Sequence, residues 1–151
     1  MGLKEKLQSD LTEAIRGRAE VKSGTIRMLL SAITNEEVSG KEARVLTDAE
    51  IITVLSREAK KRREAVDAYI AAKRTDLADK EKAEGEVIAE YLPAQLSEDE
   101  IKKMIADAIA ETGAAGPAGM GSVMKVLSPK IAGKADGGIV SGLTRQALEG
   151  L

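Results

Sequence analysis

The core of this 151-residue chain has to be built without phenylalanine or tryptophan, because the sequence contains neither and has only two tyrosines. Apolar residues nevertheless make up 43% of the chain, which is enough for a buried core. That core must consist of leucine, isoleucine, valine, methionine and alanine. Such side chains favour close-packed helices over an aromatic-rich β-sandwich. The composition therefore predicts an all-α protein.

Apolar residues at helical spacing predict two helices in the first part of the chain. The first spans about residues 3–17, and the second spans about residues 24–38. Their predicted inner faces are Leu3, Leu7, Leu11 and Ile15 in the first helix, and Ile26, Leu29, Leu30 and Ile33 in the second. Gly17 and Gly40 follow these stretches, at positions where glycine commonly ends a helix.

Two further helices are predicted between Thr47 and Pro93. The run Thr47-Asp48-Ala49-Glu50 has the pattern of a capping box, in which the Thr and Glu side chains satisfy backbone N–H groups reciprocally. The third helix continues without a helix-breaking residue to about residue 73. The fourth runs from about residue 75 to just before Pro93. Four amphipathic helices with short connections are typical of an antiparallel bundle.

The composition changes near residue 95. Ser97-Glu98-Asp99-Glu100 is a second capping box, whose acids complement the helix dipole, and nine of the fourteen glycines lie in the last 39 residues. Three helices are expected there: from Ser97 to about Gly113, over residues 120–131 and over residues 136–148. The sequence therefore predicts a helical bundle domain over residues 1–94 and a small three-helix tail domain over residues 95–151.

The composition also excludes several classes of function. The chain has no cysteine and no histidine, so disulfides, thiolate nucleophiles, Cys/His zinc sites and Ser-His relays are impossible. No carboxylate cluster is paired with a nucleophile, and we predict no catalytic residue, no metal site and no cofactor. The net charge of −2 gives no overall attraction to nucleic acid or to an anionic membrane. Because no apolar run is long enough to span a membrane, a cytoplasmic protein is expected.

The glycine-rich stretch over residues 119–143 carries no nucleotide-binding motif. Gly133-Lys134 is followed by Ala135 instead of Ser or Thr, so the P-loop pattern is absent, and no third glycine completes a dinucleotide fingerprint. The glycines are interpreted as joints that let short helices cross closely. Residues 114–145 nevertheless have a net charge of +3, because only Asp136 accompanies the basic residues Lys125, Lys130, Lys134 and Arg145. These four cations are candidate phosphate contacts.

A second basic segment, Arg57–Glu64, lies in the predicted third helix. Its charges spread around the helix and some are spaced for i,i+4 ion pairs, so one interpretation is a solvated helix face. The other is an RNA-backbone contact through Lys60, Lys61 and Arg63. Base stacking is not expected, because the two tyrosines fall at core or interface positions.

The stretches EVIAEYLPAQLSEDEIKKMIADAIAETGA and GMGSVMKVLSPKIAGKADGGIVSGLTRQAL resemble the YqeY-like family. That family is similar to the C-terminal domain of the GatB component of the glutamyl/aspartyl-tRNA amidotransferase. The resemblance covers essentially the whole chain, including TIRMLLSAI and REAKKRREAVDAY. It implies a helical bundle followed by a tail that helps recognise tRNA. The family is associated with carbon–nitrogen ligase activity with glutamine as amido-N-donor, but this chain lacks an ATP-binding core, an amidase and an ammonia channel.

We therefore expect an accessory module that binds tRNA or another structured RNA, without self-contained catalysis. By the resemblance, the tail lysines are the best candidates for the tRNA contact. One alternative is a module that docks on an amidotransferase or another translation enzyme, and a weaker one is an enzyme with an unrecognised carboxylate site. RNA binding would show a steep dependence on salt, which a mainly apolar protein interface lacks.

Overall fold

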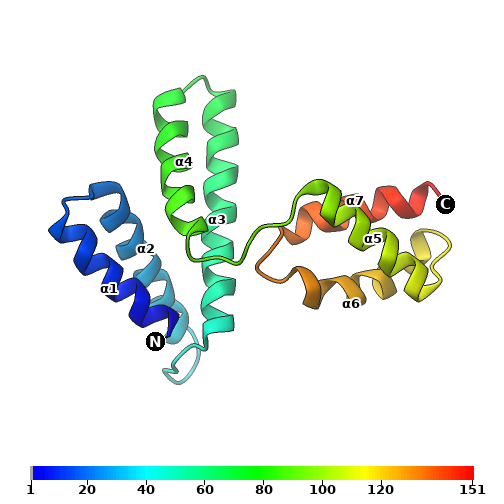
Figure 1. The fold of residues 1–151 in the computed structure, drawn as a ribbon, viewed down its shortest axis with the longest axis horizontal. Coiled ribbons are helices and arrows are strands. Elements are labelled where there is room, and N and C mark those ends of the chain that lie inside the picture. The colour runs from blue at the N-terminus through cyan, green and yellow to red at the C-terminus, as the bar shows by residue number, and fades with distance from the viewer. Residues whose placement is uncertain (1) are drawn as a thin grey trace. The chain divides into compact units, whose positions relative to one another are not determined.

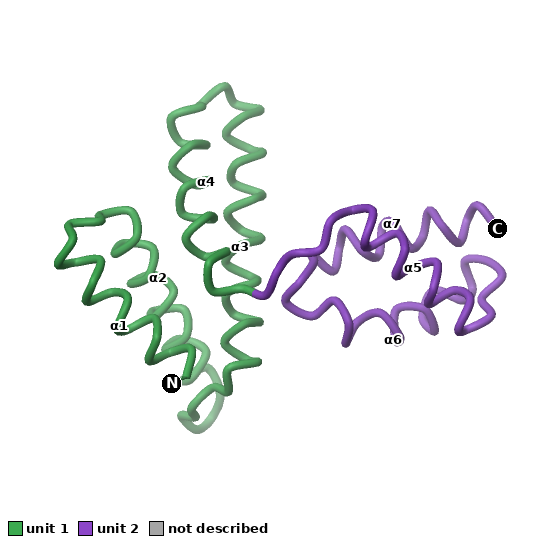
Figure 2. The backbone as a smooth tube through the Cα atoms, viewed as in Figure 1, with its two compact units in different colours: residues 1–92 green, residues 93–151 purple. Residues whose placement is uncertain are grey.

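The computed structural model describes residues 2–151, and within them it contains seven α-helices, one short 3₁₀-helix and no strand. The prediction of an all-α protein is confirmed (Figure 1). The chain divides into two compact units, Met1–Leu92 and Pro93–Leu151, which we call unit 1 and unit 2 (Figure 2). Each unit has a hydrophobic core of its own.

Unit 1 consists of two helical hairpins. Its helices are α1 (Leu3–Arg16), α2 (Glu20–Glu37), α3 (Asp48–Ala71) and α4 (Thr75–Ala89). The helices of each hairpin run in opposite directions, α1 beside α2 and α3 beside α4 (Figure 1). The two hairpin turns each pass through one residue with left-handed backbone, Arg18 with φ 55° and Lys73 with φ 59°. Because α2 also packs against α3 and α4, it joins the two hairpins.

The core of unit 1 is aliphatic apart from Tyr91. Its fully buried members come from α1 to α4: Leu7, Ile26, Leu29, Ile33, Ile51, Leu55 and Ile88. The predicted stripe of α1 is wrong at its last position, because Ile15 is 49% exposed while Ala14 is buried. Residues spaced by four advance about 40° around a helix at each step, so a stripe of four such residues leaves the buried face.

The start of α2 also differs from the prediction. The helix begins at Glu20, and Gly24 lies inside it instead of at its start. The first turns are held by hydroxyl groups: Thr25 Oγ1 donates to the carbonyl of Val21 at 2.7 Å, and Ser23 Oγ donates to that of Glu20 at 3.2 Å. Ser23 and Gly24 disfavour a helix only moderately, so packing against the rest of unit 1 can extend α2 back to Glu20.

Both predicted capping boxes are confirmed. Thr47 Oγ1 accepts a hydrogen bond from Glu50 N at 3.2 Å, and Glu50 Oε1 accepts one from Thr47 N at 3.2 Å. At the start of the fifth helix, Ser97 Oγ accepts from Glu100 N at 3.2 Å, and the Glu100 carboxylate accepts from Ser97 N. These bonds satisfy N–H groups that have no partner within the helix.

Unit 2 contains α5 (Glu98–Thr112), the 3₁₀-helix η1 (Pro117–Gly119), α6 (Met120–Ile131) and α7 (Gly137–Glu149). The helix α5 ends at Gly113, whose φ of 70° is in the left-handed region. The three α-helices pack against one another around an aliphatic core: Ile101, Ile105, Ala108, Val123, Leu127, Ile131, Val140 and Leu148. The bounds predicted for α6 are those observed.

The prediction that the glycines of unit 2 let helices cross closely holds for only some of them. A Cβ atom at Gly121, Gly137 or Gly142 would meet no atom within 4 Å, so these glycines do not allow a close helix crossing. A Cβ at Gly119 would lie 2.5 Å from the Cβ of Ala114, which makes this position a true close approach. Gly133 is a joint, since its φ of 74° is one that glycine adopts readily.

Replacement of Leu55 by Ala is expected to lower the free energy of unfolding by about 2–5 kcal/mol, because the side chain is fully buried and its loss leaves a cavity. Ile70→Ala in the same helix is the control. Ile70 is 57% exposed, so its loss should cost less than about 0.5 kcal/mol. Urea unfolding followed by circular dichroism measures both. Equal losses would contradict the helical phase of α3.

Candidate nucleic-acid interface

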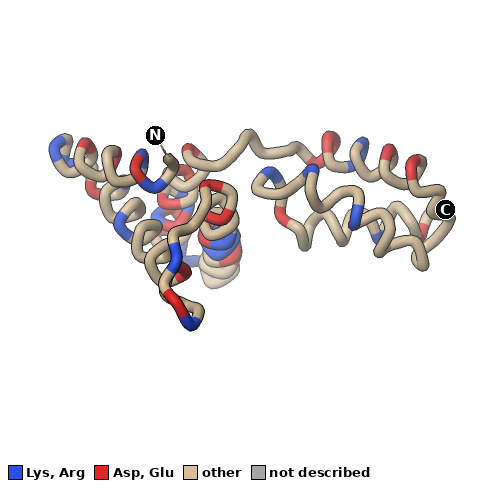
Figure 3. The backbone as a smooth tube through the Cα atoms, turned by 90° about the horizontal axis from the view of Figure 1, so that it is seen from below, with Lys and Arg blue, Asp and Glu red and all other residues tan. Residues whose placement is uncertain are grey.

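The basic segment of α3, Arg57–Glu64, is largely engaged in ion pairs. Arg57 Nη2 lies 3.2 Å from Glu36 Oε2, and Lys61 Nζ lies 3.1 Å from Glu58 Oε1. Lys60 and Arg63 are exposed residues of the same segment. Acidic and basic residues lie close together over the helices of unit 1 (Figure 3). Much of the positive charge of this segment is therefore paired with carboxylates of the protein itself.

Arg62 lies at the centre of this arrangement and is a structural residue. Its Nε atom lies 3.0 Å from Glu84 Oε2 and 3.3 Å from Glu81 Oε2, both on α4, and Nη2 lies 3.9 Å from Glu58 Oε2. Its side chain is only 14% exposed. The spacing in the sequence indicated the pair with Glu58 but not the two pairs across to α4, which arise only when the helices pack.

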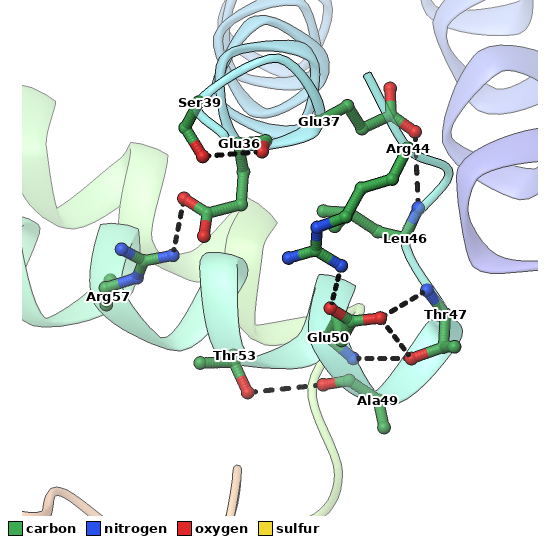
Figure 4. Close-up of polar contacts among 10 residues, drawn as sticks. All are labelled: Glu36, Glu37, Ser39, Arg44, Leu46, Thr47, Ala49, Glu50, Thr53 and Arg57. Atoms are coloured by element: carbon green, nitrogen blue, oxygen red, sulfur yellow. Dashed lines mark hydrogen bonds and ion pairs between the residues drawn. The ribbon is translucent and has the colours of Figure 1, made fainter. Parts of the chain in front are cut away.

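The connection between α2 and α3 is held by a further set of polar contacts (Figure 4). Glu37 accepts from Lys4 Nζ at 2.8 Å and from Leu46 N at 3.4 Å. The hydrogen bond from the Lys4 ammonium is the main reason why the pKa of Glu37 lies below its usual value. The Arg44 guanidinium, in contact with Glu50, likewise lowers the pKa of that carboxyl group. Lys4 and Arg44 therefore stabilise the fold, and each already has a carboxylate partner at the surface of unit 1.

The cations predicted in the tail have a different environment. Lys125, Lys134 and Arg145 are exposed, and no ion pair is recorded for them within residues 2–151. Lys130 Nζ lies 4.0 Å from Glu111 Oε2 of α5, at the limit of an ion pair. Since Lys125 is five positions away and about 140° around α6, it extends from another side of that helix.

Asp136, the only acid in the sequence between residues 114 and 145, accepts hydrogen bonds from the backbone. Asp136 Oδ1 accepts from Gly138 N at 2.7 Å and from Ile139 N at 3.3 Å, which caps α7. The capping carboxylate stabilises the N-terminus of the helix. The positive charge of residues 114–145 therefore remains on the surface of α6, α7 and their joint.

The joint that carries Lys134 is fixed by the segment before α5. Gln95 Nε2 donates to the carbonyl oxygen of Gly133 at 2.9 Å and to that of Pro93 at 2.7 Å. Leu96 N donates to the carbonyl oxygen of Lys134 at 2.9 Å. Gln95 was not predicted, because a long-range hydrogen bond to a backbone carbonyl leaves no pattern in the sequence.

Tyr91 does not offer a stacking surface. Tyr91 is buried, and its hydroxyl donates to Asp10 Oδ2 at 2.6 Å, while Lys6 Nζ lies 5.6 Å from the centre of its ring. Burial and then the bond to Asp10 raise the pKa of Tyr91 above its usual range. The same bond, with help from Lys6, lowers the pKa of Asp10. Tyr91 therefore joins α1 to the end of α4.

Other kinds of site were sought in the same residues. Within residues 2–151, no group of three or more acidic side chains is placed to hold a metal ion. None of the helices described here is both long and apolar enough to cross a membrane.

Comparison with known proteins identifies the family. The model of a family described as "Yqey-like protein" matches residues 4–148, nearly the whole chain. The chain belongs to the YqeY-like family.

Curated relatives of this YqeY-like protein occur in fungi. It is 34% identical over 96 residues to "Altered inheritance of mitochondria protein 41, mitochondrial" of Candida glabrata, an alignment that covers 62% of this chain and 53% of the relative. The protein of the same name in Saccharomyces cerevisiae (strain S288c) is 31% identical over 110 residues, which is 68% of this chain and 58% of the relative.

A protein of Schizosaccharomyces pombe described as uncharacterized is 30% identical over 95 residues, which is 63% of this chain and 76% of the relative. The aligned part thus spans little more than half of the two mitochondrial proteins. None of these three names refers to a catalytic activity.

The contact between Tyr91 and Asp10 predicts a pH-dependent stability for this YqeY-like protein. Tyr91→Phe should lower the free energy of unfolding by about 1–2 kcal/mol at pH 7, because it removes a hydrogen bond to a charged group. The pKa of Asp10 is lowered in the folded state, so this stabilisation is complete above about pH 4. It is lost as the pH falls through the folded pKa.

Urea unfolding of wild type and Tyr91→Phe from pH 7 to about pH 2.5 measures this difference. Tyr69→Phe is the matched control, since no hydrogen bond of its hydroxyl is recorded within residues 2–151, and it should change stability little at any pH. A difference between wild type and Tyr91→Phe that stays constant down to the lowest pH would show that the ionised Asp10 does not contribute.

Proposed function

We propose that this YqeY-like protein is an accessory module that binds tRNA or another structured RNA through unit 2, and that it has no catalysis of its own. Phosphate contacts dominate the affinity of most proteins for nucleic acid. A cation without a carboxylate partner can make such a contact without the loss of an ion pair. The proposal therefore rests on where the unpaired cations of the described chain lie.

The observation that carries the proposal is the contrast between the two basic regions. Residues 114–145 have a net charge of +3. Three of their four cations, Lys125, Lys134 and Arg145, have no ion pair recorded within residues 2–151. Arg57, Lys61 and Arg62 of α3 are instead paired with glutamates. A phosphate could bind to these three tail cations without breaking any ion pair recorded among residues 2–151. We therefore favour the tail over Lys60, Lys61 and Arg63 as the main RNA contact.

The surface of unit 2 supports backbone contacts over base stacking. Residues 93–151 contain no aromatic side chain on which a base could stack. The space beside Gly121, Gly137 and Gly142 is open, so a sugar–phosphate backbone can approach α6 and α7 closely there. Recognition through phosphates, sugars and shape is the mode by which proteins bind folded RNA helices.

The double variant Lys125→Ala, Lys134→Ala is expected to weaken binding of a tRNA transcript to a similar degree for different sequences. The slope of log K against log salt should fall by about 0.7–0.9 for each lost phosphate contact. The melting temperature should hardly change, because exposed charges contribute little to stability. Fluorescence anisotropy over a series of salt concentrations measures both the affinity and the slope.

Lys61→Ala is the matched control. Its ammonium already pairs with Glu58 at 3.1 Å, so its loss should leave the slope nearly unchanged. A double variant with wild-type affinity and slope would exclude these two lysines from the site. Absence of tRNA binding by the wild type at low salt would contradict the proposed function as a whole.

A further inference from the structure

The joint between α6 and α7 carries Lys134, one of the proposed RNA contacts, and it lies outside both helices. The backbone leaves α6 at Ala132, with φ −54° and ψ 120°, and turns back through Gly133, whose φ is 74°. Within the joint, Lys134 N donates to the carbonyl oxygen of Ile131 at 2.8 Å, and Ala135 N donates to the same oxygen at 3.1 Å. These two bonds hold the N–H side of the joint.

The carbonyl side of the joint is held from a distant part of the sequence. Gln95 Nε2 donates to the carbonyl oxygen of Gly133 at 2.9 Å, across 38 positions in the chain. Leu96 N donates to the carbonyl oxygen of Lys134 at 2.9 Å. These two carbonyl groups belong to the two peptide groups that flank the Cα atom of Lys134. Because a peptide group is planar, bonds on both of its sides fix its plane. Two fixed planes then fix the direction in which the Lys134 side chain leaves the backbone.

The two donors are held in place by different interactions. Leu96 packs its side chain against the core of unit 2, so its backbone position follows from that packing. Gln95 is exposed and reaches the joint through its side-chain amide. A second bond, from Nε2 to the carbonyl oxygen of Pro93 at 2.7 Å, uses the other N–H of this amide and orients it. A change at Gln95 therefore alters the support of the joint without altering the core.

We propose that Gln95 is a positioning residue of the RNA site, which holds the joint so that the ammonium group of Lys134 is presented to a phosphate. The inference rests on the proposed function, in which Lys134 makes such a contact. A lysine side chain has a flexible four-carbon stem, so its backbone is the part that the fold can order in advance. Without the amide of Gln95, the joint would have to be ordered when RNA binds, and the cost of that ordering weakens the complex.

Replacement Gln95→Met tests the proposal in the full chain, because methionine has a similar length and no hydrogen-bond donor. Binding of a tRNA transcript, measured by fluorescence anisotropy, should weaken about two- to tenfold, which corresponds to one lost hydrogen bond. The variant is expected to fold, because Gln95 is exposed. Gln8→Met is the matched control and should leave the affinity unchanged, since Gln8 is an exposed glutamine of α1 with no side-chain hydrogen bond recorded within residues 2–151.

A double-mutant cycle with Lys134→Ala separates positioning from a general structural effect. If Gln95 acts through Lys134, Gln95→Met should weaken binding in the wild-type chain and have almost no effect in the Lys134→Ala chain. An equal loss of affinity in both chains would overturn the proposal, as would wild-type affinity of the Gln95→Met variant.

The same titrations distinguish this proposal from the proposed function. If Lys134→Ala alone binds tRNA as the wild type does, while Lys125→Ala binds more weakly, the positioning role of Gln95 is wrong and the proposed function stands. Absence of tRNA binding by the wild type contradicts both.

Hydrogen exchange of the free protein examines the joint without RNA. The amide protons of Lys134 and Ala135, which both bond to the carbonyl oxygen of Ile131, should exchange faster in Gln95→Met than in the wild type, because the joint opens more often. In Gln8→Met their exchange rates should equal those of the wild type. Unchanged rates in Gln95→Met would show that Gln95 does not hold the joint, whatever the result with tRNA.

Discussion

Aliphatic packing between neighbouring helices is the interaction on which both units depend. An isolated helix of the lengths seen here is marginal in water, so each one is maintained by the face that it buries. In unit 1, Leu29 and Leu55 lie in a common core with Leu7 and Ile88, and that core connects all four helices. Unit 2 is smaller and relies on a second core formed by α5, α6 and α7. Apart from Tyr91 these cores have no aromatic ring, and they gain their stability from many small contacts between closely spaced helices.

Charged residues fulfil two purposes in this protein. In unit 1 they connect helices: Arg62 joins α3 to α4, Lys4 joins α1 to the end of α2, and Arg57 joins α3 to α2. In the tail, the cations of α6 and α7 extend from the surface, and among residues 2–151 an ion pair is recorded for Lys130 alone of them. A count of lysines and arginines would treat the two regions alike. Their ion pairs distinguish them, because a cation that already has a partner gains less from a phosphate.

Local features of the fold were readily predicted from the sequence. The capping residues Thr47 and Ser97 and the bounds of α6 depend on interactions within a few residues, which a sequence pattern records directly. Features that depend on tertiary packing were missed. The exposure of Ile15, the two α4 partners of Arg62 and the bonds made by Gln95 arise from contacts between distant parts of the chain. For the candidate site, the sequence located the cations but not which of them are paired.

The hydrogen bonds from Gln95 and Leu96 to the joint between α6 and α7 determine where a complete fragment of unit 2 has to begin. The helices of unit 2 start at Glu98, yet the joint between α6 and α7 is bonded to the two residues just before the cap of α5. A recombinant fragment that starts at Ser97 would retain the three helices and the buried members of their core, but not Leu96, which packs against that core. It would lack both bonds to the carbonyls of Gly133 and Lys134, so the backbone that presents Lys134 would lose its outside support. A fragment that begins at Pro93 keeps the joint complete.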